Sequence, residues 1–390
     1  MRLLIAAGGT GGHIYPALAV ARSLLGRPDA PELVWVGGRR GFEGSLVPAA
    51  GLRLRRLVLR SLRSVDVSVN TVLDPLRLAA SVPQATAIVA RERPAAILTT
   101  GGYVAVPILL AAAPLGIPVV LWEGNVVPGR AVRLTARLAD VLAVSFEATC
   151  RALSRQPDDG SSDGPCFVTG TPIRETRDVD RDASRARLGV PEGVPVLLIF
   201  GGSQAVRRFN AAVAAALPRL VERVAVIHVT GDDGYGAALS GREALPAELR
   251  ERYRPYPFLR DEMLAALASA DLVVGRAGSS TLAEACALGL PMIVVPYPHA
   301  SGHQRANAVA LVEAGAARLV EDEAFDADAL LDAAGLLDEP AELAAMAAAA
   351  RSLGRPGAAD AVADLVTTVA LRRPLPDQAA IDRRAGGAVA

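Results

Sequence analysis

Three glycine clusters constrain the fold of this chain most, because each follows a short apolar run and precedes a helical pattern. They are Gly8-Gly9-Thr10-Gly11-Gly12-His13, Gly201-Gly202-Ser203-Gln204 and Gly275-Arg276-Ala277-Gly278-Ser279-Ser280-Thr281. Glycine at a strand-to-helix turn permits positive φ and lets a ligand approach the backbone. The helix that follows presents unpaired N–H groups and partial positive charge, which suit a phosphate. One such cluster could simply turn the chain, but three in register favour a phosphate-bearing ligand.

Elsewhere, apolar β-rich runs alternate with helical patterns such as 16–25 and 282–288. The expected strands form two series, 3–7, 33–36, 96–99, 119–122 and 141–144, then 196–200, 225–229, 272–274 and 292–295. Strands this apolar suit parallel sheets that helices cover on both faces. The alternation is typical of doubly wound α/β architecture. We therefore predict two Rossmann-like domains of similar size that face each other across a cleft.

The charge balance and the cysteines exclude several classes of protein. Among the 390 residues, 41 basic and 41 acidic side chains cancel, so a nucleic-acid partner held by overall charge is not expected. The three cysteines, Cys150, Cys166 and Cys286, lie far apart and make an odd count. That pattern is typical of a reducing compartment, and it argues against a disulfide framework or a cysteine-based metal site.

The longest uncharged run, 103–122, raises the question of a transmembrane helix. Pro107, Pro114, Gly116 and Pro118 interrupt this run, so we predict a buried helix, a turn and a buried strand instead. The first residues lack the length and the cleavage-site context of a signal peptide. These observations predict a soluble, cytoplasmic protein.

Two common nucleotide-binding motifs are absent from the sequence. The dinucleotide fingerprint G-x-G-x-x-G/A fails in the first glycine cluster, where Ile14 stands at its last position. The P-loop pattern G-x-x-x-x-G-K-[ST] cannot occur, because the chain contains no lysine. Hydride transfer and P-loop hydrolysis therefore both lose support.

Several polar residues stand where a parallel sheet would place a ligand. His13 lies at the start of the first helix, where it can act as a general base or simply bond to the loop backbone. Glu123 and Asn125 follow a buried strand, so they point into the ligand crevice or serve in a turn. Glu284 lies on the helix that the third cluster opens. It can accept hydrogen bonds from ribose hydroxyls, or it can be a capping partner of Ser280 or Thr281.

A further polar cluster, His299, His303, Gln304 and Asn307, follows the strand expected at 292–295. Amides dominate this cluster and no acidic ligand stands beside it, so it favours recognition of sugar hydroxyls over metal ligation. We predict no metal site.

Seven ordered motifs run through the chain. They are the first glycine cluster with 16–19, then 101–104, 116–120 and 170–174, the second glycine cluster, 276–278 with Thr281 and Glu284, and 303–304 with 307–308. Together they resemble the MurG-type N-acetylglucosaminyltransferases of bacterial cell-wall synthesis, over about residues 1–345. The resemblance implies the GT-B fold, in which two Rossmann-like domains face each other across a cleft.

The resemblance also implies a domain organisation. Residues 1–160 form an N-terminal domain that faces the acceptor and the membrane, and 161–345 form the UDP-sugar-binding domain. Residues 346–371 form a C-terminal helix that returns to the first domain. The polar loop 154–165 marks the boundary region, and the Pro- and Gly-rich segment 372–390 is expected to be a disordered tail.

The activity that the resemblance implies is an inverting transfer of N-acetylglucosamine from UDP-N-acetylglucosamine to lipid-linked N-acetylmuramyl-pentapeptide. The C4 hydroxyl of this acceptor attacks, so that lipid I becomes lipid II. No cofactor and no metal is implied, because helix N-termini can carry the charge of the departing UDP. The expected location is the cytoplasmic face of the cell membrane, where the enzyme is peripheral.

The site residues follow from the matching motifs. On the donor side, the side chain of Arg174 and the backbone near Leu259 would read the uracil, and Glu284 would bind the ribose. Ser203, Gln204 and Thr281 would hold the diphosphate region, and Gln304 would recognise the sugar. On the acceptor side, Thr10, Gly11, Tyr103 and Asn125 would line the site. His13 is the leading base, and Glu123 is the second candidate or orients the base. The family usually has His-Glu-Gln-Asn where this chain has Trp122-Glu123-Gly124-Asn125, so the acceptor side lacks the Gln side chain.

A lipid acceptor implies that the first domain contacts the anionic inner membrane surface. Arginines and leucines alternate between 52 and 63, and Leu73, Leu76 and Leu78 flank Arg77. The arginines of the first stretch are Arg53, Arg55, Arg56, Arg60 and Arg63. An apolar patch rimmed by arginine suits peripheral membrane contact. A surface strand and an amphipathic helix that cover the core would explain the same pattern.

Two alternatives come from other classes. One is a different GT-B enzyme, with another sugar or acceptor, or a nucleotide-sugar epimerase. The other is a non-catalytic protein that binds a nucleotide sugar. Release of UDP without an acceptor would favour the epimerase, and tight UDP binding without turnover would favour the binding protein.

Overall fold

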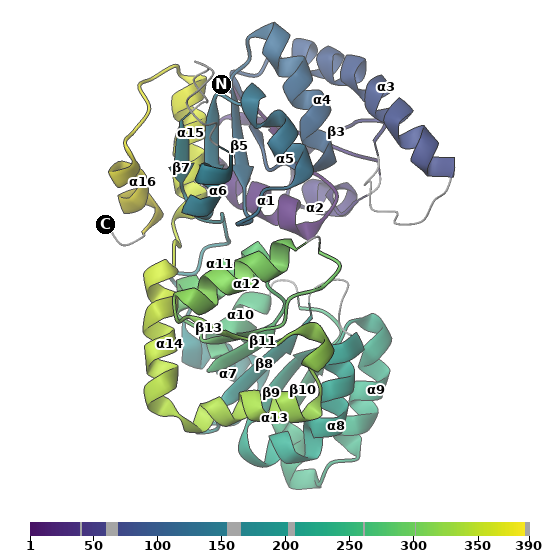
Figure 1. Ribbon diagram of the computed structural model, residues 1–390, viewed down its shortest axis with the longest axis vertical. Helices are drawn as coiled ribbons and strands as arrows, with labels where there is room; N and C mark the ends of the chain where they lie inside the picture. Colours follow the sequence, from purple (N-terminus) through teal and green to yellow (C-terminus); the bar gives the residue numbers. More distant parts are fainter. Residues whose placement is uncertain are drawn as a thin grey trace. The chain divides into compact units, whose positions relative to one another are not determined.

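The computed structural model describes residues 1–39, 41–59, 69–153, 165–201, 207–259, 262–300 and 302–386, with the backbone alone for 69–75. The chain forms two compact units (Figure 1). Unit 1 comprises Met1–Arg174 and Arg355–Ala390, and unit 2 comprises Glu175–Gly354. Each unit is built on its own parallel sheet, so the predicted fold class of two Rossmann-like α/β domains is confirmed.

Unit 1 contains a seven-stranded sheet in the order β3-β2-β1-β4-β5-β6-β7. Its strands are β1 (Arg2–Ala6), β2 (Glu32–Gly37), β3 (Arg53–Arg56), β4 (Ala96–Thr99), β5 (Val119–Glu123), β6 (Val141–Val144) and β7 (Cys166–Val168). All neighbouring pairs are parallel. Because β7 pairs with β6, residues 166–168 belong to the sheet of unit 1. The domain boundary predicted at 160 is therefore wrong, and the division falls after Arg174.

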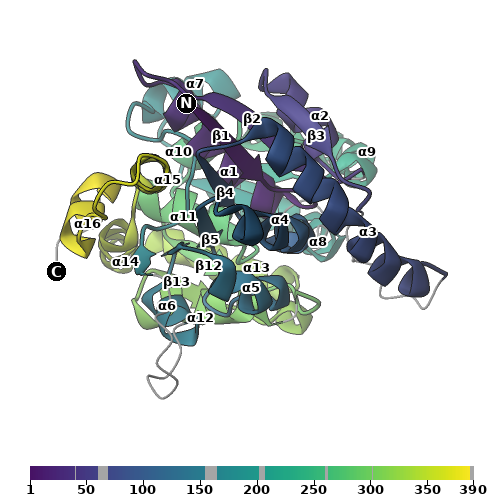
Figure 2. The same ribbon diagram turned by 90° about the horizontal axis from the view of Figure 1, so that it is seen from above.

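The helices of unit 1 cover both faces of this sheet. They are α1 (Gly11–Leu25), α2 (Glu43–Ala49), α3 (Val69–Glu92), α4 (Gly102–Ala112), α5 (Arg130–Thr135), α6 (Glu147–Leu153), α15 (Ala358–Ala370) and α16 (Gln378–Ala385), with short 3-10 turns η1 (Ala113–Leu115) and η2 (Ala136–Leu138). Successive residues of β1 show the two faces. Leu3 and Ile5 join α1 and α15 in one core, whereas Leu4 and Ala6 join α3 and α4 in the other. Figure 2 shows α3 and α4 side by side, with the start of α3 projecting beyond the sheet.

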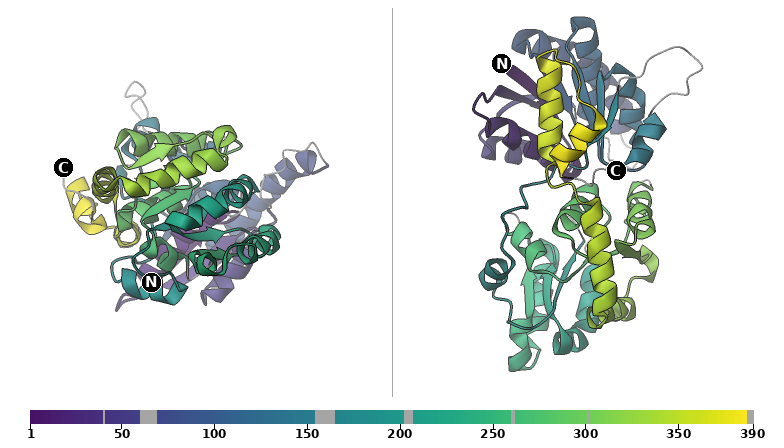
Figure 3. Two further views of the ribbon diagram at one scale, coloured as in Figure 1. Left: turned by 90° about the horizontal axis from the view of Figure 1, so that it is seen from below. Right: turned by 90° about the vertical axis from the view of Figure 1, so that its left-hand side faces the viewer.

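The C-terminal segment belongs to the core of unit 1 as far as it is described. Residues 372–386 were expected to be disordered, and this expectation is wrong, because α16 buries Ile381 and Ala385 to 2% and 0% exposure. Asp382 accepts a hydrogen bond from Arg355 (2.6 Å), and Gln378 bonds to the backbone of Val168 in β7 (3.0 Å). Figure 3 shows α15 and α16 beside the sheet of unit 1. The chain thus returns to this unit at residue 355, and the helix that returns is α15.

Unit 2 contains a six-stranded parallel sheet in the order β10-β9-β8-β11-β12-β13. Its strands are β8 (Val196–Phe200), β9 (Ala225–Val229), β10 (Tyr253–Tyr256), β11 (Leu272–Gly275), β12 (Met292–Val294) and β13 (Ala317–Leu319). Its helices are α7 (Arg181–Leu188), α8 (Arg207–Arg223), α9 (Asp232–Glu243), α10 (Met263–Ser269), α11 (Ser279–Leu288), α12 (His303–Glu313), α13 (Ala327–Gly335) and α14 (Pro340–Leu353), with 3-10 turns η4 (Ala247–Arg252), η5 (Asp322–Ala324) and η6 (Leu336–Asp338).

The segment 103–122 in unit 1 forms α4, a turn and β5, as predicted. Among the described residues, no helix has both the length and the apolar character to cross a bilayer.

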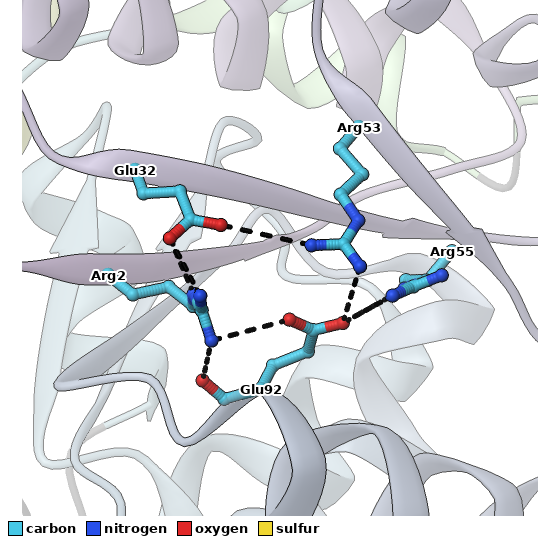
Figure 4. Close-up of polar contacts among 5 residues, drawn as sticks. All are labelled: Arg2, Glu32, Arg53, Arg55 and Glu92. Atoms are coloured by element: carbon cyan, nitrogen blue, oxygen red, sulfur yellow. Dashed lines mark hydrogen bonds and ion pairs between the residues drawn. The ribbon is translucent and has the colours of Figure 1, made fainter.

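An ion-pair network closes the amino edge of the sheet in unit 1 (Figure 4). Glu92, the last residue of α3, is 3% exposed and lies 2.8 Å from Arg55, 3.7 Å from Arg53 and 3.6 Å from Arg2. Glu32 adds a pair with Arg2 at 2.7 Å. Burial alone would raise the pKa of Glu92, but the hydrogen bond from Arg55 and the three arginine charges lower it below its ordinary value. The network fixes the end of α3 to the edge of the sheet.

The cysteines are paired differently from the prediction. Cys150 in α6 and Cys166 in β7 form a disulfide with Cα atoms 5.9 Å apart. The prediction failed because α6 leaves the sheet directly from β6, so the chain that returns as the neighbouring strand β7 meets α6 again. Cys286 in unit 2 is a buried thiol, and burial raises its pKa to about 12. This thiol is therefore a packing group with little thiolate character.

Candidate active site

The candidate acceptor site of unit 1 is built on the loops that leave the carboxyl ends of β1, β4 and β5. Ligands of open α/β sheets bind at this edge. The β4 loop touches both neighbours, because a Cβ on Gly101 would lie 2.8 Å from Val132 of α5 and 3.8 Å from the ring of His13 in α1. Gly101 and Gly102 have φ values of 78° and 72°, which L side chains rarely adopt. The sequence motif 101–104 is thus the backbone against which His13 rests.

His13 is oriented by the backbone of the same β4 loop. Its Nδ1 lies 2.6 Å from the carbonyl oxygen of Thr100, which can only accept a hydrogen bond. Nδ1 therefore carries the proton, and Nε2 carries the lone pair. The Thr100 hydroxyl in turn donates to the backbone carbonyl of His13 (2.8 Å). The Nδ1 contact sets the tautomer that a general base needs, and the Thr100 hydroxyl holds the backbone of His13 in place.

The carboxylate of Glu123 is hydrogen-bonded within its own loop. It is 3% exposed, and one carboxylate oxygen accepts from the backbone N–H and the side-chain amide of Asn125 (2.9 and 2.8 Å). The other oxygen accepts from the N–H of Gly129 (3.1 Å), the residue before α5. Thr149 donates to the carbonyl of Asn125 (2.8 Å). The contacts of Glu123 thus organise the β5–α5 loop, and they favour His13 as the base.

The helix N-termini of the first and third glycine clusters share a feature that suits anions. Neither α1 nor α11 has a side-chain cap at its N-terminus or an acidic residue in its first turn. Thr10 is the N-cap of α1, and a Cβ on Gly12 would meet only the Thr10 hydroxyl at 3.8 Å. A Cβ on Gly11 would instead lie 2.9 Å from Tyr15. Gly12 therefore leaves the backbone open at the start of α1.

Tyr103, predicted on the acceptor side, lies partly buried at the start of α4. Its hydroxyl donates to Glu43 at 3.2 Å. Burial, followed by the charge and hydrogen bond of Glu43, raises the pKa of Tyr103, so the phenol remains a donor. Glu43 itself was not predicted from the sequence, where it stands in a polar, glycine-rich stretch with no pattern that marks it as buried.

The third glycine cluster in unit 2 is held by buried polar side chains. Arg276 is 6% exposed and bonds to the carbonyls of Val295 and Pro296 (3.1 and 3.3 Å) and to Asp322 (2.5 Å). Its guanidinium lies 4.8 Å from the ring centre of Phe209. Asn307 of α12, 0% exposed, donates to the carbonyl of Ala277 (3.2 Å). These contacts join the loop after β11 to the loop after β12 and to α12.

The predicted donor residues are placed as follows. Thr281 and Glu284 lie in the first turns of α11, and Glu284 is 9% exposed. The side-chain carbonyl of Gln304, at the start of α12, accepts from the N–H of Tyr297 (2.9 Å), which orients its amide NH₂. Leu259 has a buried side chain, so only its backbone is suited to a ligand. Arg174 is partly buried at the end of the first segment of unit 1, and Ser203 and Gln204 lie outside the described residues.

A surface cavity of about 490 Å³ lies elsewhere in unit 1. Its lining includes Gly116 and Pro118 before β5, Asp140 before β6, and Arg372 after α15. These residues precede their strands, so the cavity lies at the amino edge of the sheet and is separate from the His13 loops.

Comparison with known proteins agrees with this geometry. Residues 3–144 match the family model described as glycosyltransferase family 28 N-terminal domain, and 196–365 match the glycosyltransferase family 28 C-terminal domain. A UDP-N-acetylglucosamine--N-acetylmuramyl-(pentapeptide) pyrophosphoryl-undecaprenol N-acetylglucosamine transferase of Desulforudis audaxviator is 39% identical over 378 residues, 95% of this chain and 99% of the relative. The enzyme with the same description from Moorella thermoacetica is 40% identical over 375 residues, 94% of this chain and 98% of the relative.

Solved structures share the fold of this chain. The crystal structure of MurG from Acinetobacter baumannii aligns with a TM-score of 0.70 and 26% identity, and the match covers 94% of this chain and 99% of that one. A calicheamicin glycosyltransferase aligns with a TM-score of 0.66 at 17% identity, over 96% of this chain and 99% of that one, which is a likeness of fold alone.

Proposed function

Because the chain belongs to glycosyltransferase family 28, we propose that it transfers N-acetylglucosamine from UDP-N-acetylglucosamine to lipid I and so forms lipid II. The observation that carries the acceptor half of this proposal is the orientation of His13. Its Nδ1 is 2.6 Å from the Thr100 carbonyl, and its Nε2 therefore has the lone pair that can accept a proton. The donor half rests on α11, whose N-terminus has no acidic side chain in its first turn and whose Glu284 is suited to a ribose.

In the proposed reaction, His13 removes the proton from the C4 hydroxyl of the N-acetylmuramyl sugar. The oxygen attacks the anomeric carbon of N-acetylglucosamine from the face opposite to UDP. The bond from this carbon to the diphosphate oxygen breaks, and UDP leaves with the electron pair, so the configuration inverts. The N–H groups at the start of α11 stabilise the charge on the diphosphate. Thr281 lies in that turn, and the Gln304 amide NH₂ is available to the hydroxyls of the donor sugar.

The proposal is tested with purified protein, UDP-N-acetylglucosamine and a water-soluble lipid I analogue. We expect UDP release only when the acceptor is present, together with a disaccharide product of inverted configuration. UDP-N-acetylgalactosamine serves as the control donor and should be used at least tenfold more slowly, since one misplaced hydroxyl leaves polar groups of a sugar site unpaired. Release of UDP without acceptor would replace the proposal with an epimerase, and UDP binding without turnover would replace it with a binding protein.

We also propose that unit 1 binds the inner face of the cell membrane through α4 and α5, which lie next to each other. Leu134 of α5 and Leu110 of α4 are 77% and 44% exposed. Two exposed arginines flank Leu134 in sequence, Arg130 at the start of α5 and Arg137 in the adjoining η2. Apolar side chains among arginines suit an anionic lipid surface. The stretch 52–59 does not form such a patch, because Leu57 and Leu59 are buried and Arg53 and Arg55 pair with Glu92. Arg60, Arg63 and Leu73 lie outside the described side chains.

Membrane contact through α5 and the adjoining η2 predicts weaker binding when the arginines of these two elements are removed. Each arginine near an anionic surface contributes about 1 kcal/mol, so the double change Arg130→Gln and Arg137→Gln should weaken binding roughly thirtyfold. The measurement is co-sedimentation with phosphatidylglycerol-containing vesicles at low and high salt. Arg219→Gln with Arg223→Gln, two exposed arginines on α8 of unit 2, is the matched control. Equal binding of both double variants would refute the assignment to α5.

A further inference from the structure

A buried carboxylate connects two of the loops that surround His13. Glu43, the first residue of α2, is 0% exposed. One of its oxygens accepts from the backbone N–H of Gly9 at 3.0 Å, in the first glycine cluster. The other accepts from the N–H of Gly38 at 2.9 Å and from the hydroxyl of Tyr103 at 3.2 Å. Three donors thus converge on a single side chain.

Glycines form a cradle around this carboxylate. A Cβ on Gly8 would lie 2.8 Å from a carboxylate oxygen of Glu43, and one on Gly37 would lie 2.7 Å from its Cγ. A Cβ on Gly41 would overlap the same carboxylate. Contacts under 3.0 Å are essentially never made by real Cβ atoms, so these three positions leave room for Glu43. The first half of the Gly8-Gly9 motif therefore holds an internal side chain as well as turning the chain.

A second set of glycines makes room for Tyr103. A Cβ on Gly9 would lie 2.9 Å from the tyrosine ring, and one on Gly38 would lie 2.5 Å from its hydroxyl. Gly9 also has a φ of 95°, where L side chains are strained. Glu43 and Tyr103 thus fill the space between the β1, β2 and β4 loops, and the β1 and β2 loops have glycine at the points of contact.

The residues just before Tyr103 contact His13. The two residues before it, Gly101 and Gly102, pass the imidazole, and a Cβ on Gly102 would lie 3.4 Å from Nε2. Thr100, one step further back, supplies the carbonyl that fixes Nδ1 (2.6 Å). On the other side, Gly9 immediately precedes Thr10, the N-cap of the helix that carries His13. Glu43 therefore restrains the chain on both sides of the imidazole.

Only a carboxylate satisfies this arrangement. All three partners of Glu43 are donors, and the two carboxylate oxygens can accept all of them. An amide of the same size would have to turn its NH₂ group towards an N–H or O–H donor, which leaves a buried hydrogen bond unmade.

We propose that Glu43 is a positioning residue for the acceptor half of the reaction, which sets the tautomer and the placement of His13 through the Gly9 turn and the Tyr103 loop. The inference rests on the proposed function for its kinetic consequence. The tautomer of His13, which the inference also concerns, can be measured without turnover.

The kinetic test is Glu43→Gln. A base displaced by a fraction of an ångström to 1 Å can cost on the order of a hundredfold in rate, so we expect kcat to fall roughly 10- to 100-fold. The KM for UDP-N-acetylglucosamine should change less than twofold, because Thr281, Glu284 and Gln304 lie in unit 2. Tyr103→Phe, which removes one of the three donors and leaves the carboxylate, should lower kcat by a smaller factor. The effects of the two changes should be less than multiplicative in the double variant.

The matched control is Glu92→Gln, which replaces another buried carboxylate of unit 1 at the opposite edge of the sheet. This variant should lose thermal stability and keep its kcat. If Glu43→Gln keeps kcat within twofold, or if Glu92→Gln loses as much as Glu43→Gln, then the positioning role is refuted. If Glu43→Gln does not fold, the Tyr103→Phe variant decides in the same way, and an unchanged kcat in it refutes the role.

The second measurement is the tautomer of the His13 imidazole. The chain has four histidines, so the ¹⁵N resonances of His13 can be assigned by comparison with His13→Gln. The unmodified protein should show the Nδ1–H tautomer, whereas Glu43→Gln should show a mixture of tautomers. If the unmodified protein lacks acceptor-dependent turnover, the proposed function fails, and the tautomer measurement still decides the inference. An identical spectrum in Glu43→Gln overturns it.

Discussion

Replacing His13 with alanine should lower kcat roughly 100- to 10,000-fold, the usual contribution of a positioned general base. The hydrogen bond to Thr100 presents Nε2 as the only acceptor atom of the ring, and alanine offers none. The KM for UDP-N-acetylglucosamine should change little, because Glu284 and Gln304 lie in the other unit. Initial rates of UDP release at saturating donor and acceptor measure the effect.

Glu123→Gln is the comparison that separates the two candidate bases. Its carboxylate accepts from Asn125 and Gly129, so the amide should disturb the β5–α5 loop and raise the KM for the acceptor more than it lowers kcat. A His13→Ala enzyme within tenfold of the unmodified rate, next to an inactive Glu123→Gln enzyme, would reverse the assignment.

The second large effect concerns stability in acid. His228 in β9 is 1% exposed, and burial lowers its pKa from the usual 6.5 to about 3. Its Nδ1 lies 2.9 Å from the hydroxyl of Tyr253, and among the described residues no hydrogen-bond partner reaches its Nε2. A proton on this ring would place a charge in the apolar core of unit 2, which is costly.

The folded and unfolded states bind different numbers of protons at His228, and this difference sets how stability changes with pH. Between pH 6.5 and about pH 3, the unfolded chain takes up a proton at His228 and the folded chain does not. The free energy of unfolding of unit 2 therefore falls as the pH falls, by about 1.4 kcal/mol per pH unit from this residue alone. Above pH 6.5, His228 contributes no slope. The contribution lost by pH 3 approaches about 5 kcal/mol.

Urea unfolding at pH 6.5 and pH 4.5 tests this prediction. His228→Phe should lose about 2 to 3 kcal/mol less than the unmodified protein over this interval. Tyr253→Phe keeps the buried imidazole and should retain the full slope. Both tryptophans, Trp35 and Trp122, lie in unit 1, so their fluorescence follows that unit while circular dichroism also reports unit 2. Identical slopes in the unmodified protein and His228→Phe would contradict the account.

The interior strands were predictable from the sequence, and the edge strands were not. All nine expected strands are present, and every one of them has a neighbour on both sides. The four strands that were missed, β3, β7, β10 and β13, are the edges of the two sheets. An edge strand is only partly covered, so it carries polar residues or proline, as in the Arg53–Arg56 and Tyr253–Tyr256 strands. The hydrophobic signal that identifies a buried parallel strand is absent from these two segments, whereas the edge strand β7, Cys166–Val168, is apolar but only three residues long.

In the candidate site, too, some residues could be predicted from the sequence and others could not. The places of His13, Glu123 and Glu284 in the fold could be predicted, because each stands at a fixed offset from a strand end or a glycine cluster. Glu43 could not, since its burial depends on three loops that meet only in the folded sheet. The glycines around it, Gly37, Gly38 and Gly41, were the one available signal, and their meaning becomes clear only when the side chains that they accommodate are known. The helix α16 was missed for a similar reason. Its short apolar face is buried only by contact with a distant part of the chain.

A crystal structure of the protein with bound UDP decides whether the donor binds to unit 2 and the acceptor to unit 1. We expect the ribose hydroxyls within hydrogen-bond distance of the Glu284 carboxylate, with the diphosphate at the first turn of α11. A UDP molecule bound instead at the His13 loops of unit 1, with Glu284 unoccupied, would contradict the assignment of donor and acceptor sides.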